Sequence, residues 1–368
     1  MGINYLLKKE GLEEIEKLDT MHINTIAKNI SEKLCDSFPE LHLDQSDLFV
    51  SISRLDMYTA KMPDNNASAK YVYNKNEIYF NKNLDLNDID TLAIHECIHC
   101  LQELYDTKGR LVRLGLYDLN SKVGLALNEA ATQLMASVAT KSDVDSATYY
   151  GITINSISPI YYPLECAILN QMMYFTGTYP LYHSTLLSND IFQNTFSSIS
   201  SKEVYFEISK RLDKLLNVET EISNLSYKIS TFDGNEEKLK YLNKQVENKK
   251  IYIQKLFLSI QDLIIDKCFT KMFNEINSFN DIREFQNMLY NFKDLIVTTP
   301  DYTFYNNFYC NMMKDVAFKR DQLIKYGSII DINIPKQSLA LVPIKTTTSK
   351  LGKLKELIDT LTSFIFGD

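Results

Sequence analysis

The stretch His95-Glu96-Cys97-Ile98-His99 fits the pattern H-E-x-x-H, and it lies in a segment with the apolar periodicity of a helix. Positions i and i+4 share one face of an α-helix, so both imidazoles can point at a single ion. Two neutral imidazoles suit Zn²⁺, and Glu96 stands beside the first of them without being a ligand itself. The stretch therefore predicts a metal-binding helix. The plainer alternative is an amphipathic helix that carries two surface histidines.

A catalytic zinc ion takes three protein ligands and keeps one position open, so the two histidines need a partner. Glu129 is the candidate, because it stands on the next strong helix, predicted over about 123–139, among apolar neighbours. A carboxylate in such surroundings is costly to bury unless it is paired or binds a metal. His183 and Glu103 are alternative third ligands, although Glu103 would share the helix of the histidine pair and is poorly directed. Otherwise, Glu129 is simply exposed near a helix start.

Together, His95-Glu96-x-x-His99 and the downstream Asn128-Glu129-x-x-Thr132 resemble the gluzincin zinc metallopeptidases, the thermolysin-like group. The resemblance implies that Glu129 is the third zinc ligand, and that Thr132 takes a position held by Ser in that group. It covers residues 45–200 at most, and within that range only the two motifs are specific.

Gln133 departs from the gluzincin pattern, in which an Asp at this place orients a zinc-bound His. An amide oxygen can still accept a hydrogen bond from an imidazole N–H, but it lacks the charge. The segment Ile78-Tyr79-Phe80, shortly before the motif helix, resembles the edge strand that such peptidases use to hold a substrate chain.

The activity that the resemblance implies is that of a zinc-dependent endopeptidase. In that chemistry, zinc lowers the pKa of a bound water, Glu96 removes its proton, and the hydroxide attacks a peptide carbonyl. The oxyanion needs a further donor, for which Tyr162 and His183 are the candidates, with simple packing as the alternative for one Tyr among 23. Two functions compete with this one: a non-catalytic zinc-binding or regulatory protein on a peptidase scaffold, and a secreted bacterial effector or toxin protease.

The apolar pattern predicts an α+β fold that is mostly α, with a helical domain over 201–368. The resemblance implies that residues 1–200 form a zincin-like metallopeptidase domain. A small antiparallel sheet is expected over about 45–82, and the active-site helices over about 87–140. The elements expected in the first domain are a helix within the first 40 residues, strands at 48–57, 71–73 and 78–80, and a motif helix capped by Asp85, Asn87 or Asp88. A further helix is expected from Leu164 to Phe175, with Pro163 in its first turn, and Gly177 and Pro180 end it.

Between about 203 and 273, apolar residues step by three and four around a break at Phe232-Asp233-Gly234-Asn235. This pattern predicts a coiled-coil-like hairpin of two long helices, with Lys249 as a polar member of the heptad seam. The hairpin either packs into a helical domain or protrudes as an arm for self-association or partner binding. The remaining expectations are helices near 281–297 and 302–326, then a tail with a short strand at 329–334 and a helix at 350–364.

The 368-residue chain is 45% hydrophobic and 11% aromatic, which excludes disorder as its main character. Its net charge of −8 disfavours nucleic acid as a partner. A peptide or protein substrate is the one that the resemblance implies. Arg is scarce, with six against 33 Lys, which suggests an AT-rich bacterial genome.

The six cysteines are scattered along the chain, unlike the disulfide framework of a small secreted domain. Cys97 and Cys100 form a C-x-x-C that overlaps the motif, but helix geometry turns both away from the histidine face, so buried thiols are expected. No stretch reaches the roughly 20 apolar residues of a membrane helix. With no signal peptide recognised, the cytoplasm is the expected compartment, and leaderless secretion is the alternative.

Overall fold

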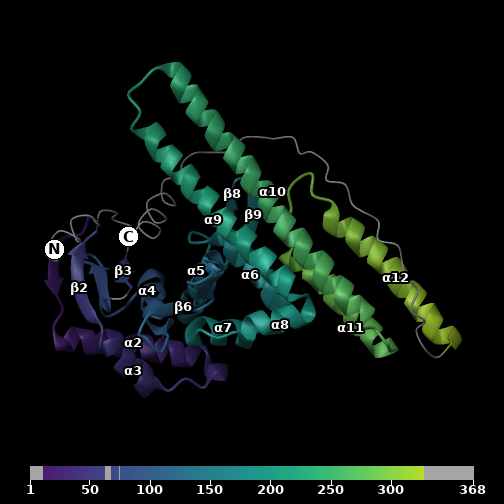
Figure 1. The fold of residues 1–368 in the computed structure, drawn as a ribbon, viewed down its shortest axis with the longest axis horizontal. Coiled ribbons are helices and arrows are strands. Elements are labelled where there is room, and N and C mark those ends of the chain that lie inside the picture. Colours follow the sequence, from purple (N-terminus) through teal and green to yellow (C-terminus); the bar gives the residue numbers. More distant parts are fainter. Residues whose placement is uncertain (1–10, 63–67, 74, 327–368) are drawn as a thin grey trace.

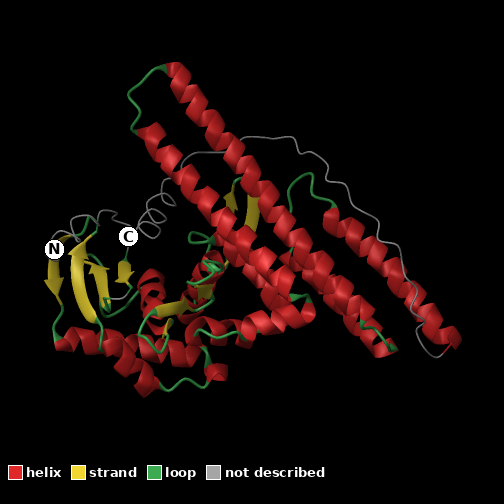
Figure 2. Cartoon of the chain, viewed as in Figure 1, coloured by secondary structure: helices red, strands yellow, loops and turns green. Residues whose placement is uncertain are grey.

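The computed structural model describes residues 11–62, 68–73 and 75–326. These residues form mostly helices, with small sheets gathered toward one end and the middle of the molecule (Figure 2). The prediction of an α+β fold that is mostly helical is confirmed. Within the described ranges, no helix is both long and apolar enough to cross a membrane.

The largest sheet has four strands in the order β1-β2-β4-β3. The strands are β1 (Glu13–Lys17), β2 (Asp56–Lys61), β3 (Ala69–Val72) and β4 (Glu77–Asn81). The predicted hairpin of β3 and β4 is confirmed, but the prediction of an antiparallel sheet is wrong, because β2 and β4 run parallel. The chain crosses from β2 to the outer position, forms β3 there, and returns as β4 between them. β3 is therefore an edge strand and β4 is interior, which corrects the edge role expected for residues 78–80.

At the N-terminal end, the prediction of a continuous helix is wrong in part. Leu12 and Ile15 pack in a small cluster with Tyr79, on one face of the sheet, and the segment that contains Ile15 is the strand β1. The helix that follows is α2 (Thr20–Ser37), capped by Asp19. Apolar residues three apart fit a bulged edge strand as well as a helix, and the packing on the sheet decides between them.

The strand predicted at 48–57 is mostly a helix, α3 (Gln45–Ser53). The Asp44 side chain accepts hydrogen bonds from the N–H groups of Ser46 and Asp47, which supplies an N-cap just before a run that reads as β-branched. Packing against α2 keeps the segment helical, and β2 begins only at Asp56.

The motif helix is α4 (Thr91–Leu101), and its cap is Asp90, whose side chain accepts from Ala93 N at 2.9 Å. This cap corrects the expected ones, which lie two to five residues earlier in the chain. The second motif lies on α5 (Leu125–Ala139), which packs beside α4. Two small sheets that the sequence did not indicate flank these helices: β5 (Glu103–Tyr105), β6 (Leu111–Leu114) and β7 (Tyr117–Asp118) in one, and β8 (Asp145–Tyr149) and β9 (Ile152–Ser156) in the other.

The next helix, α6 (Pro163–Thr176), has Pro163 in its first turn and Gly177 as its C-cap, as expected. Pro180 does not end it, because Pro180 lies in the first turn of a further helix, where its missing N–H costs nothing. The two helices that follow are α7 (Thr178–Leu187) and α8 (Ile191–Ile199).

The predicted pair of long helices is α9 (Lys202–Ser230) and α10 (Glu236–Asn274), which lie side by side (Figure 1). One end packs on the body, where α9 contacts α5 and α8, and α10 contacts α6. Toward the other end, Tyr227 and Tyr241 are each 61% exposed. Lys249 forms an ion pair with Glu221 across the hairpin. The hairpin therefore combines a packed base with an exposed tip.

The remaining described elements are α11 (Phe279–Asn291), the 3₁₀ turn η2 (Phe292–Leu295) and α12 (Phe304–Tyr326). The strand expected at 329–334 and the helix expected at 350–364 lie outside the described residues. One apolar core runs from α2 through to α12, so the described helices of both predicted domains share it. The boundary near residue 200 stays a prediction.

Candidate metal centre

Three buried side chains converge between α4 and α5. His95, His99 and Glu129 each offer a ligand atom within 4.8 Å of the others, and none is more than 2% exposed. The two Nε2 atoms are 2.9 Å apart, and Glu129 Oε2 lies 3.3 Å from Nε2 of His95 and 3.6 Å from Nε2 of His99. The i, i+4 spacing places the imidazoles on one helix face, and the neighbouring helix supplies the carboxylate.

The tautomers of both histidines follow from their other ring nitrogens. His95 Nδ1 lies 3.0 Å from Gln133 Oε1, and His99 Nδ1 lies 2.9 Å from Gln102 Oε1. An amide oxygen only accepts hydrogen bonds, so each Nδ1 carries the proton and each neutral ring presents a lone pair at Nε2. Two lone pairs and a carboxylate then face the same small space.

This donor set fits a zinc ion. Neither oxygen of the Glu129 carboxylate accepts a hydrogen bond from the described residues, although both are buried. An unsatisfied buried carboxylate is costly, and a cation held between it and the two imidazoles would remove that cost. Two imidazole nitrogens and one carboxylate oxygen are a ligand set that Zn²⁺ takes at catalytic centres.

The charges agree with that role. Burial lowers the pKa of His95 and so favours the neutral imidazole that binds metals. In His99, burial also acts to lower the pKa, but the charge of Glu129 outweighs it and raises this pKa. Burial would raise the pKa of Glu129, but the charge of His99 and the contacts with both imidazoles outweigh it and hold this pKa at about 2. Glu129 is therefore a carboxylate at neutral pH.

Behind His99, a buried network fixes the ligand geometry. Gln102 Oε1, which faces His99 Nδ1, also accepts from Asn128 Nδ2 at 3.0 Å, and Gln102 Nε2 donates to Thr132 Oγ1 at 2.8 Å. The family resemblance matches Asn128 and Thr132 to positions of a motif but does not say what they contact, and it gives no role to Gln102. The signal for Gln102 is its position three residues after His99, where the helix ends and its side chain turns back.

Glu96 is adjacent to His95 in the motif, but its carboxylate makes a hydrogen bond to the edge strand. Its Oε2 accepts a hydrogen bond from Tyr71 N at 2.7 Å, so the motif helix is tied to the edge strand β3. Burial raises the pKa of Glu96 to about 7, against the charge of His99 and the Tyr71 hydrogen bond, which lower it. A carboxyl with a pKa near 7 can both accept and return a proton at neutral pH.

Two tyrosines flank the histidines. Tyr162, a sequence candidate, precedes α6 in a left-handed conformation (φ 50°), and its ring stacks on His95 with centroids 6.0 Å apart. Tyr73, which the sequence interpretation missed, places its ring edge-on to His99 with centroids 5.9 Å apart. The signal for Tyr73 is the strand period of two, which puts it on the same face as Tyr71.

Other sequence candidates lie outside this group. His183 is on α7, where its Nδ1 bonds to the Asn189 amide and its ring meets Tyr179. Glu103 is not on the motif helix, because that helix ends at Leu101, and its carboxylate accepts hydrogen bonds from the hydroxyls of Tyr71 and Tyr105.

The two motif cysteines behave as buried thiols. Cys97 is fully buried, and Cys100 Sγ donates to the Cys97 carbonyl at 2.9 Å. Burial raises the pKa of both thiols, so neither is a thiolate at neutral pH. None of the residues that hold the candidate centre is a cysteine.

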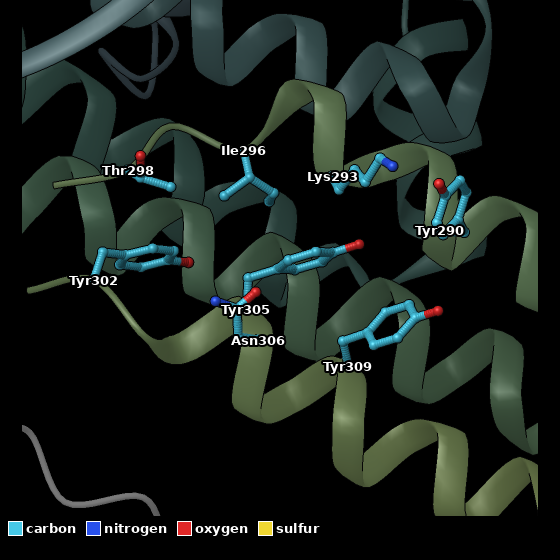
Figure 3. A pocket seen from close by; sticks show the side chains of 8 residues that line it. All are labelled: Tyr290, Lys293, Ile296, Thr298, Tyr302, Tyr305, Asn306 and Tyr309. Atoms are coloured by element: carbon cyan, nitrogen blue, oxygen red, sulfur yellow. The ribbon is translucent and has the colours of Figure 1, made fainter. Parts of the chain in front are cut away.

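A pocket of about 290 Å³ lies in the C-terminal helical region and shares no residue with the candidate centre (Figure 3). Its aromatic walls come from α11, α12 and the segment between them. The hydroxyl of Tyr302 donates to Asp262 at 2.7 Å, and that of Tyr305 donates to the Leu289 carbonyl. Two of the hydroxyls that line the pocket are therefore engaged in hydrogen bonds within the protein.

Comparison with protein-family models gives no match, and no curated protein and no solved structure is found to be similar to this chain. The function is therefore argued from the site alone.

Proposed function

We propose that this protein is a zinc-dependent metallopeptidase of the gluzincin kind. One observation carries the proposal: His95, His99 and Glu129 meet inside the fold, with the buried Glu129 Oε2 at 3.3 Å from Nε2 of His95 and 3.6 Å from Nε2 of His99. Glu96, the acid between the two histidines in the motif, lies in the same buried region, and burial raises its pKa to about 7.

In this proposal the residues hold the ion, orient its ligands, or carry a proton. His95, His99 and Glu129 would hold the ion, and Gln133 and Gln102 fix the ring orientation of the two histidines. When bound, zinc supplies Lewis acidity that polarises a carbonyl and acidifies water.

Glu96 is the proton carrier in this proposal. Its carboxylate takes a proton from the attacking water and later returns it to the amine of the departing peptide. The bond to Tyr71 N occupies one side of the carboxylate and fixes its orientation, which leaves Oε1 for the water.

The substrate surface that we infer is the outer edge of β3. Within the described residues, β3 pairs only with β4 in its sheet and packs beside α4, and of its outer main-chain groups Tyr71 N is already bonded to Glu96. An extended peptide can add to such an edge through main-chain hydrogen bonds. A polypeptide is therefore the substrate class proposed here.

The proposal is tested by incubating the wild-type protein and Glu96→Gln with a diverse peptide library, with and without a chelator. We expect cleavage by the wild type, its loss with chelator, its recovery with added zinc, and no cleavage by Glu96→Gln. Glu207→Gln, on the exposed face of α9, is the matched control and should cleave as the wild type does. A protein that holds zinc yet cleaves no library peptide would favour a non-catalytic zinc-binding protein instead.

A further inference from the structure

Each imidazole of the candidate centre has one phenol ring against it. Tyr162 stacks on His95 with an interplanar angle of 14°, and Tyr73 meets His99 at 64°. The two rings come from separate segments of the chain, one just before α6 and the other just after β3. The sequence analysis names Tyr162 as a candidate hydrogen-bond donor to the oxyanion, and it assigns no function to Tyr73.

The position of Tyr73 is fixed by its neighbours on the edge strand. Tyr71 N is held by Glu96, and the Tyr71 hydroxyl donates to Glu103 Oε1 at 2.9 Å, so this residue is anchored at both ends. The Tyr73 ring packs edge-on to the Tyr71 ring, with centroids 5.4 Å apart and planes at 81°. The phenol is thus held between β3 and His99, beside the edge where a substrate chain would lie.

The Tyr73 hydroxyl is available as a donor. Among the described residues it has no hydrogen-bond partner, and its side chain is partly exposed. A phenol has an ordinary pKa of about 10, so this hydroxyl is protonated at neutral pH and can donate a hydrogen bond.

We propose that Tyr73 is a second catalytic tyrosine, whose hydroxyl donates a hydrogen bond to the oxygen of the scissile carbonyl as negative charge develops there. A protonated donor already in place at that oxygen stabilises the transition state more than the ground state. No covalent bond to Tyr73 forms or breaks. This inference rests on the proposed peptidase function and adds the edge-strand side of the centre to it.

The test uses Tyr73→Phe, which removes one oxygen atom and keeps the ring. Tyr58→Phe is the matched control, because Tyr58 lies on β2 and stacks on Tyr79 in the other, smaller apolar cluster. The proteins are loaded with Co²⁺, and the visible absorption of the metal is followed as acetohydroxamate, an oxyanion-bearing metal ligand, is added. This readout needs no cleavage.

We expect Tyr73→Phe to bind Co²⁺ with the wild-type spectrum and to bind acetohydroxamate roughly tenfold to a hundredfold more weakly, the usual effect of losing a hydrogen bond to a charged group. On any peptide that the wild type cleaves, the loss should appear in kcat more than in KM. Unchanged acetohydroxamate affinity in Tyr73→Phe would overturn this inference alone. A wild-type protein that binds no metal would overturn the proposed function and this inference together.

Discussion

The Glu96 carboxylate accepts the backbone N–H of Tyr71 at 2.7 Å, and this bond joins the motif helix α4 to the edge of the sheet. Without this bond, both the Tyr71 N–H and Oε2 of the buried Glu96 would lack this hydrogen-bond partner. The same contact therefore stabilises the fold and fixes the orientation of the proposed proton carrier relative to the proposed substrate edge.

Removal of the metal should leave a folded but less stable protein. The shared apolar core does not depend on the ion, whereas the Glu129 carboxylate does. With zinc at a hundredfold excess over its dissociation constant, we expect about 2.7 kcal/mol of additional unfolding free energy, measured by urea denaturation with and without chelator. The matched variant Glu129→Gln should be insensitive to added zinc, and a zinc-dependent rise of similar size in that variant would contradict the assignment.

Gln102→Leu should weaken zinc binding about tenfold to a hundredfold, because His99 loses the acceptor that fixes its tautomer. Asn128 and Thr132 lose their partner as well, so the stability of the zinc-free variant must be measured alongside. Zinc affinity is followed by competition with a chromogenic chelator. Wild-type affinity in a folded Gln102→Leu protein would show that the network does not orient the ligand.

Two buried acids at the base of the hairpin predict how stability depends on pH. Glu165 on α6 and Glu219 on α9 are buried together, and Glu165 has no hydrogen-bond partner among the remaining described residues. Burial raises the pKa of both carboxyls, and in Glu219 the neighbouring Glu165 raises it further. The folded protein therefore keeps a proton that the unfolded chain releases above the ordinary value of 4.5.

The sign follows from that retained proton. Because the folded state binds more protons, unfolding free energy is greatest below pH 4.5 for this pair and is lost as pH rises toward the folded pKa values, at up to about 1.4 kcal/mol per pH unit for one proton. Glu219→Gln should flatten this slope and be more stable than the wild type at pH 8, while Glu207→Gln should keep the slope. Urea titrations from pH 5 to 8 measure it, and an unchanged slope in Glu219→Gln would count against the pair.

Lys249 offers a test of the packed seam in the hairpin. Its ammonium pairs with Glu221, and both side chains are partly exposed, so the pair contributes less than about 1 kcal/mol. Lys249→Leu continues the heptad seam and should raise the unfolding free energy by up to about 1 kcal/mol. Glu221→Gln, which breaks the pair without adding an apolar group, should not. A marked loss of stability in Lys249→Leu would mean that this position is not part of the seam.

The two chemical motifs could be read from the sequence because helical spacing alone decides which side chains share a face. His95 and His99 needed only the period of the helix, and Glu129 needed only a neighbouring helix with a buried acid. The long hairpin was predictable for the same reason: its apolar residues repeat locally, and the break near residue 233 marks the turn.

What could not be predicted depends on contacts between distant segments. β1 forms because Leu12 and Ile15 pack against Tyr79 of the sheet. α3 forms because Asp44 caps it and α2 packs against it. Tyr73 reaches the centre only because β3 takes the outer place in the sheet, which follows from strand order and not from local pattern.

The central claim is that Glu129 completes a zinc centre with the two motif histidines, and zinc content measured by elemental analysis tests it most directly. The variants are Glu129→Gln, with Glu103→Gln and His183→Ala as controls at the alternative third ligands. We predict about one zinc ion per chain in the wild type and both controls, and a strong loss in a folded Glu129→Gln protein. Wild-type zinc content in Glu129→Gln, or its loss in Glu103→Gln or His183→Ala instead, would contradict the account.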